Sequence, residues 1–205
     1  SNMRTILVRL LSSENVDNQA HAKIFKCFGQ LAKVAPLGVQ EDVPELMKVM
    51  LQSMEEFPCD IQLNGNIADC IQNLAKVIPL SVQPYLEAIV PRFIALLSID
   101  DEDPNQLEDE EDEYEGRMPF SSDDMKCSLL ESLSDLPSDM AQVIPDLVSA
   151  INHFFDLGDE FIQIAAAKSI LLMNNGLMQS SFDITPLIST IIDKIPKSPH
   201  LSVLS

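Results

Sequence analysis

Glycine and aromatic residues are scarce in this sequence. It has six glycines and no tryptophan, and aromatic residues make up 5% of its 205 residues. Six glycines leave little material for a loop that cradles phosphate, and no P-loop, GxGxxG, GxSxG or HExxH motif occurs. Paired carboxylates are abundant only in one acidic run, where the fixed geometry of acid–base catalysis is not expected. We therefore predict that the chain is not an enzyme and uses no cofactor.

Basic residues are also few. Lys and Arg number 13 against 32 Asp and Glu, so the net charge at pH 7 is −19. Binding to nucleic acid or to an anionic membrane depends on Lys and Arg contacts to phosphate, so neither partner is expected. The chain should instead attract basic partner proteins. No run of 18 apolar residues and no signal peptide is evident, so we expect no membrane span.

The cysteines and histidines do not indicate a metal site. The four cysteines form no CxxC pair, and the three histidines fall in three different regions. The acidic run lacks the DxDxDG pattern and the Glu at position twelve of an EF-hand, so calcium binding is not indicated. We predict small buried thiols in a reducing compartment, and histidines that are packed or on the surface. These residues are Cys27, Cys59, Cys70 and Cys127, and His21, His153 and His200.

What the chain does contain is an internal repeat. Residues 31–40 read LAKVAPLGVQ and residues 74–83 read LAKVIPLSVQ, with eight of ten positions identical at an offset of 43. In and just before each copy, apolar residues follow the 3.6-residue period of an amphipathic helix. The two apolar stripes consist of Ile24, Phe25, Cys27, Phe28, Leu31, Ala32 and Val34, and of Ile67, Cys70, Ile71, Leu74, Ala75 and Val77.

A proline ends each of these predicted helices, and a second amphipathic run follows it. Pro36 and Pro79 lack the backbone donor that would continue the helix. The second run spans residues 43–54 in the first copy and 90–99 in the second. We expect Pro44 and Pro91 in the early part of these second helices, where proline is tolerated best. The predicted unit is therefore a helix, a proline turn and a second helix.

The unit recurs with weaker similarity further along the chain. Residues 125–136 and 144–155 form a third copy, and residues 162–173 and 185–195 form a fourth. Two-helix units of about 40–47 residues are typical of HEAT and armadillo arrays, in which stacked copies bury one another's apolar faces. Tetratricopeptide units are shorter and carry aromatic landmarks that are missing here. We predict an all-α fold, namely a HEAT-repeat α-solenoid of stacked antiparallel helix pairs.

The repeats also predict the division of the chain. Ser1 and Asn2 precede Met3 and resemble the remnant of a tag, and the rest of residues 1–16 resembles the end of a preceding repeat. The other expected boundaries are 17–57, 58–99, 121–157 and 158–196 for four repeats, 100–120 for an acidic disordered insertion, and 197–205 for a tail without an assigned role.

Methionines gather in the predicted helices. Met47, Met50 and Met54 fall at i, i+3 and i+7, which places them on one helix face. Such a stripe is consistent with core packing, and also with an adaptable groove for partner helices.

The insertion carries over half of the net charge. Residues 100–115 contain eleven acids and no base. Blocks of like charge repel and do not pack. The insertion could serve solubility alone, or it could form an electrostatic surface for a basic ligand; a long insertion in a compact array favours the second interpretation. The candidate binding residues are Asp100, Asp101, Glu102, Asp103, Glu108, Asp109, Glu110, Glu111, Asp112, Glu113 and Glu115.

The order of these segments resembles nuclear import receptors of the importin-β superfamily, most closely the importin β-3 branch. The resemblance covers most of residues 17–195. It rests on YLEAIVP at 85–91, the acidic run at 100–115, Lys126–Cys127, the VIPDL helix at 143–147 and AAAKS at 165–169. The sequence departs from many HEAT units in lacking the Arg of a D-x-x-V-R pattern, because Gln163 stands near Asp159 where that Arg is expected.

The resemblance implies a non-catalytic scaffold that shuttles between cytoplasm and nucleus. Receptors of this superfamily bind basic cargo proteins on a concave face, release them when Ran–GTP binds, and contact the Phe–Gly repeats of nucleoporins. Four and a half repeats would be a fragment of such a receptor. A HEAT-repeat scaffold of another class, such as a phosphatase scaffold or a vesicle-coat adaptor, is the alternative.

Overall fold

The computed structural model describes residues 2–11, 16–99 and 121–136, together with 162–166, 169, 185 and 189. These residues form α-helices, short 3-10 helices and their connections, and no strand occurs among them. The predicted all-α fold class is thus confirmed. The elements are α1 (Asn2–Leu11), α2 (Asn18–Val34), α3 (Pro36–Val39), η1 (Gln40–Asp42), α4 (Val43–Glu56), α5 (Ile61–Val77), α6 (Pro79–Val82), η2 (Gln83–Tyr85), α7 (Leu86–Leu97) and α8 (Ser122–Asp135).

The 43-residue offset of the sequence repeat holds at the level of whole elements. Helices α2 and α5 have the same length, and α3, η1 and α4 have counterparts in α6, η2 and α7 that each begin 43 residues later. The caps are equivalent too. Asp17 and Asp60 accept hydrogen bonds from the N–H groups of Ala20 and Leu63, which satisfies a free donor at each helix start. Residues 17–97 are therefore two copies of one structural unit.

One expectation about the second helices was wrong. Pro91 lies inside α7 rather than near its start, because α7 begins at Leu86. Val-Pro occurs at both 43–44 and 90–91, which suggested that the two dipeptides occupy equivalent positions. The structure aligns the two units differently. At the true offset, Pro44 is equivalent to Glu87. Pro91 is exposed, so water can reach the carbonyl that its missing N–H leaves without a partner.

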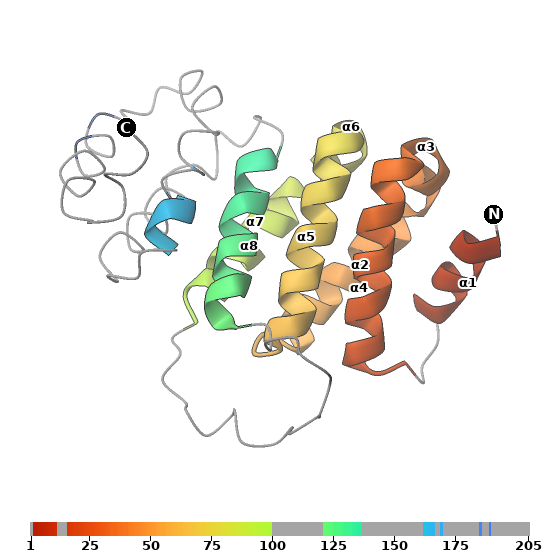
Figure 1. The fold of residues 1–205 in the computed structure, drawn as a ribbon, viewed down its shortest axis with the longest axis horizontal. Helices are drawn as coiled ribbons and strands as arrows, with labels where there is room; N and C mark the ends of the chain where they lie inside the picture. Colours follow the sequence, from red (N-terminus) through yellow and green to blue (C-terminus); the bar gives the residue numbers. More distant parts are fainter. Residues whose placement is uncertain are drawn as a thin grey trace.

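The first and second helices of the units form two separate rows. Helix α5 packs between α2 and α8, whereas α4 packs against α7 on the other side (Figure 1). Helix α8 begins at a capping box in which Ser121 and Asp124 exchange hydrogen bonds, so it starts as α2 and α5 do, at an N-cap side chain. We refer to α2, α5 and α8 as the first-helix row, and to α4 and α7 as the second-helix row.

The hydrophobic core lies between the two rows. Equivalent positions of the units fill it with different side chains: Met47 and Met50 of α4 correspond to Val90 and Phe93 of α7, and all four are fully buried. Met54 is buried as well, so of the two interpretations of the methionines, core packing is confirmed.

Close contact in the first-helix row depends on a glycine. A Cβ atom on Gly29 would lie 3.2 Å from the Cα of Cys70 and 3.1 Å from the side-chain nitrogen of Asn73. The missing side chain therefore lets α2 approach the backbone of α5.

Several predicted core positions are not in the core. Cys27 is exposed although its equivalent Cys70 is buried, and Val34 is 80% exposed. Cys59, in the turn between the units, is also exposed. Position 27 differs from position 70 because α5 has a neighbouring first helix on each side, while among the described elements the other side of α2 meets only the short α1. The prediction of buried thiols holds for Cys70, whereas Cys127 is half-buried.

The apolar stretch Pro79–Leu97 is long and apolar enough to cross a membrane, judged by length and composition alone. Core helices of soluble proteins pass the same test. In this fold the larger apolar residues of α7 pack into the core, namely Leu86, Ile89, Val90, Phe93, Leu96 and Leu97.

Two leucines of the repeated stretch provide a matched test of this fold. Leu74 is fully buried and Leu80 is 81% exposed. Leu74→Ala should lower the free energy of unfolding by about 2–5 kcal/mol, because it leaves a cavity in the core. Leu80→Ala should change it by less than about 0.5 kcal/mol. Urea denaturation followed by circular dichroism would measure both, and equal effects would contradict the burial assigned to these positions.

Candidate functional site

The eleven acids of residues 100–115 lie outside the described residues. Their role as a binding surface stays a prediction. His153 and His200 also lie outside, as do the predicted second helices of the third and fourth repeats apart from Thr185 and Ser189, which are helical.

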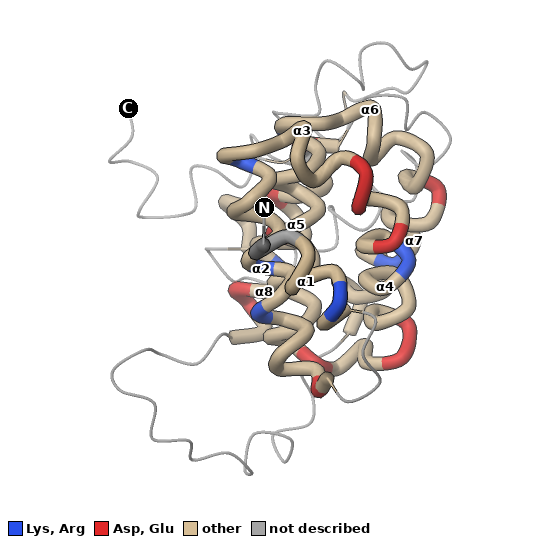
Figure 2. The backbone as a smooth tube through the Cα atoms, turned by 90° about the vertical axis from the view of Figure 1, so that its right-hand side faces the viewer, with Lys and Arg blue, Asp and Glu red and all other residues tan. Residues whose placement is uncertain are grey.

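The described residues carry a second acidic surface, on the second-helix row. We call it the second-helix face. Six acids and two bases line it, and Figure 2 shows acidic positions along the side where α4 and α7 lie. Helix α2 of the first-helix row, in contrast, has three lysines and no acid. The face consists of Glu41, Asp42, Glu45, Glu55, Glu56 and Glu87, with Lys48 and Arg92.

One ion pair ties the two helices of this face together. A terminal nitrogen of Arg92 lies 2.9 Å from Oε2 of Glu55, so the pair joins α7 to α4. Arg92 also donates to the carbonyl of Ala88 at 3.1 Å. These two contacts hold the guanidinium against its own helix and its neighbour, so this cation neutralises only one of the acids of the face.

Glu45 and Glu87 are the acids of this face most available to a ligand. Each is exposed and lies in the first turn of its helix, and the described residues offer neither a hydrogen-bond nor an ion-pair partner. The two positions therefore present negative charge on neighbouring, packed helices.

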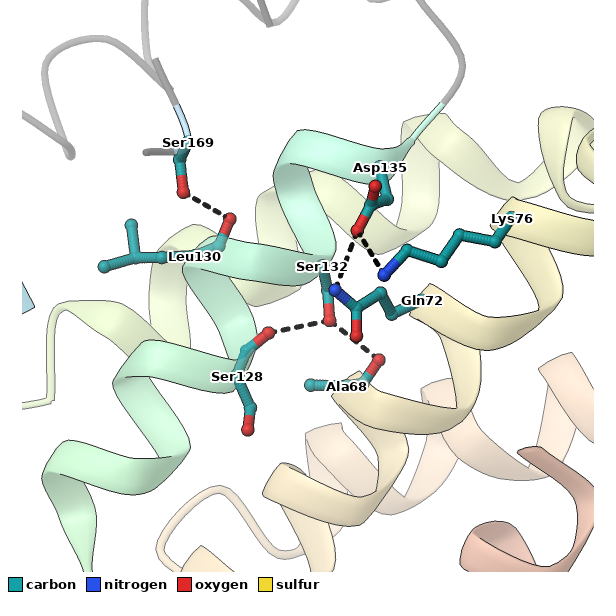
Figure 3. Close-up of polar contacts among 8 residues, drawn as sticks. All are labelled: Ala68, Gln72, Lys76, Ser128, Leu130, Ser132, Asp135 and Ser169. Carbon is teal, nitrogen blue, oxygen red and sulfur yellow. Dashed lines mark hydrogen bonds and ion pairs between the residues drawn. The ribbon is translucent and has the colours of Figure 1, made fainter. Parts of the chain in front are cut away.

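The first-helix row uses its polar groups for stacking. The hydroxyl of Ser132 on α8 donates to the carbonyl of Ala68 on α5 at 2.8 Å, and Ser169 repeats the arrangement with the carbonyl of Leu130 at 2.7 Å (Figure 3). Each hydroxyl also lies within bonding distance of a carbonyl in its own helix. Buried serines thus link successive first helices.

A partly buried polar contact continues this link. Asp135 of α8 lies 3.0 Å from the ammonium of Lys76 and accepts a hydrogen bond of 2.7 Å from Gln72, both on α5 (Figure 3). Asp69 makes a related contact, because it is partly buried and bonds to Ser128. These acids are occupied by the neighbouring helix, which leaves the second-helix face as the better candidate for a ligand.

No cluster of catalytic groups emerges from the described residues. Within them, no group of three or more His, Cys, Asp or Glu side chains could hold a metal ion. Burial raises the pKa of the Cys70 thiol well above its usual range, which keeps it protonated. His21 stacks on Phe25, and burial lowers its pKa. The prediction that the chain is not an enzyme stays a prediction.

The second-helix face was not identified from the sequence. Its acids are spread over 47 positions between Glu41 and Glu87, and two lysines lie among them. Sorting charges by repeat position would not have found it, because none of the six acids has an acidic equivalent in the other unit. The eleven acids of residues 100–115, in contrast, lie within 16 consecutive positions and are evident in the sequence.

No family model matches the chain, and no curated protein and no solved structure matches it. The resemblance to importin-β receptors therefore rests on the residues quoted for it.

The buried carboxyl of Asp69 predicts a pH effect. Burial, the largest influence, raises its pKa above the ordinary value of 3.8. An acid with a raised pKa in the folded state costs stability above pH 3.8, because the unfolded chain releases the proton first. Asp69→Asn should therefore make the protein more stable at pH 7, with the difference shrinking as the pH falls towards 3.8.

Denaturation of both proteins across this pH range would measure the effect. Asp60→Asn, which keeps a residue type that also caps helices, is the matched control and should not stabilise the protein at pH 7. A destabilised Asp69→Asn variant at pH 7 would contradict the assignment.

Proposed function

We propose that this chain is a stack of HEAT-type helix pairs, an α-solenoid, that binds basic segments of partner proteins without catalysing a reaction. The observation that carries the proposal is the second-helix face, where six acids stand against two bases on packed helices. The acidic run at residues 100–115 adds eleven carboxylates of the same sign.

The repeated unit supports the solenoid part of the proposal. Two copies share an offset of 43 residues in their helices, caps and buried positions, and their first helices pack side by side. A unit of this kind can be added at either end of a row, because each first helix presents an apolar face to the next. Helix pairs stacked in this way form the extended surfaces that solenoids use for binding.

The mechanism of recognition is electrostatic. Carboxylates at Glu45, Glu87 and their neighbours raise the local concentration of a Lys- and Arg-rich segment and speed its encounter with the chain. These charges are exposed, so salt screens them, with a Debye length of about 8 Å at physiological ionic strength. Binding should therefore weaken steeply as salt increases.

Within this class, the resemblance favours a nuclear import receptor. The ligands would then be basic cargo proteins, Ran–GTP would regulate their release, the outer surface would contact nucleoporin Phe–Gly repeats, and the protein would shuttle between cytoplasm and nucleus. A phosphatase scaffold or a vesicle-coat adaptor is the alternative, and it would bind a folded partner at salt concentrations that abolish binding of a basic peptide.

Neutralising the second-helix face tests the binding proposal. Glu45→Gln with Glu87→Gln should weaken binding of a Lys- and Arg-rich peptide about threefold to tenfold at low salt, since an exposed ion pair contributes up to about 1 kcal/mol. Fluorescence anisotropy over a salt series would measure it. The double Glu→Asp variant keeps the charges and should bind nearly normally. Unchanged affinity in the Gln variant would count against this face as the site.

A second comparison tests the acidic run. Replacing its eleven acids with Ser or Asn should leave the helix content unchanged and weaken binding of the same peptide. Capture of Ran loaded with GTP by the same proteins would separate the import-receptor proposal from the other scaffolds. Peptide binding without any Ran capture would favour the alternative.

A further inference from the structure

Two leucines at equivalent positions of the repeat are almost fully exposed. Leu37 on α3 and Leu80 on α6 lie 43 residues apart, and each side chain is 81% exposed. Figure 1 shows α3 and α6 at the same edge of the two rows. An exposed leucine on its own needs no explanation, but the same exposure at the same position in two units is a regular feature of the surface.

Packing does not explain why these leucines are identical. Core positions have diverged between the units, as when Phe25 is replaced by Ala68 and Met50 by Phe93. Within the repeated ten residues, Ala32 and Val39 and their equivalents are buried, and Pro36 and Pro79 begin the short helices. The two leucines have no such structural role.

The repeated lysines of the same stretch, in contrast, do have a structural role. Lys76 forms an ion pair with Asp135 of the next first helix. Lys33, its equivalent, lies close enough to Asp69 to favour the charged form of that carboxyl, against the larger effect of burial on the pKa. Both lysines thus act on the first helix of the following unit. The leucines remain as exposed, repeated residues without a partner inside the fold.

An exposed acid follows each of these leucines along the chain. Glu41, in the 3-10 helix η1, follows Leu37 by four residues and is exposed. Glu87, in the first turn of α7, lies seven residues after Leu80 in a nearly continuous helical segment and is also exposed. The apolar edge therefore borders the second-helix face and would meet the same ligand.

We propose that Leu37 and Leu80 form an apolar edge of the second-helix face, and that the partner segment is therefore basic and amphipathic rather than only basic. This inference rests on the proposed function. The units that carry the two leucines are stacked through α2 on α5 and α4 on α7, and packed helices lie about 8–10 Å apart, so the partner should present two apolar side chains at about that spacing. A helix provides it between positions i and i+7, which are about 10.5 Å apart. Its Lys and Arg residues would contact Glu41, Glu45 and Glu87.

A pair of synthetic peptides tests the proposal on the full 205-residue chain. One is a helical, Lys- and Arg-rich peptide with leucines at i and i+7, and the other has serines at those two positions. The leucine peptide should bind the unaltered chain about fivefold to tenfold more tightly, because covering apolar surface is favourable. Leu37→Ser with Leu80→Ser should remove that difference and leave binding of the serine peptide unchanged.

A matched variant controls for the loss of exposed apolar surface elsewhere. Ile6→Ser with Leu10→Ser changes two residues of α1 that are 55% and 41% exposed and should leave the binding of both peptides unchanged. Circular dichroism would verify that all variants keep their helices.

The outcomes separate this inference from the proposed function. Equal binding of the two peptides, or a preference that survives in the Leu37→Ser, Leu80→Ser variant, would overturn the apolar edge and leave the proposed function intact. Failure of both peptides to bind the unaltered chain would overturn both. Self-association that the same variant abolishes, measured by sedimentation, would make a second copy of the chain the occupant and overturn the proposal.

Discussion

Burial of helix α5 between two other first helices is the constraint on which the described structure depends. Its residues from Leu63 to Ala68 are all buried, and so are most of those from Cys70 to Ala75, whereas α2 is buried mainly on one face. A helix buried on both sides needs small residues where a neighbouring backbone approaches it, as at Gly29. Its buried polar groups also need hydrogen-bond partners, as Ser132 provides for the carbonyl of Ala68. Its neighbours therefore have to be first helices placed in register with it.

This stacking uses polar groups differently in the two rows. Polar groups of the first-helix row are used between helices, as the contacts of Asp135 with Lys76 and Gln72 show. The second helices lie on the other side of the core, and few of their acids are paired with bases there. A surface with an excess of one sign attracts ligands of the other sign.

The two copies of the unit differ most in their second helices, where no position is identical, and least at the turn between their helices. Core positions tolerate exchange when the total volume is kept, as with Met50 and Phe93. The turn keeps its proline, a buried valine and an exposed leucine in both copies. Part of this agreement comes from the geometry of the turn. The exposed leucine lies outside that explanation, and this is why it points to contact with another molecule.

The sequence by itself determined the helical fold class, the two-helix unit and its 43-residue period, because apolar periodicity and proline are local signals. It also placed the three methionines on one helix face, which the structure shows to face the core. Only the tertiary structure decided that Cys27 and Val34 face solvent, since exposure depends on which side of a helix has a neighbour. The position of Pro91 inside α7 is set by packing between the two rows of helices. A repeated Val-Pro dipeptide does not encode that packing. The second-helix face likewise exists only in three dimensions, because its acids come together when α4 packs on α7.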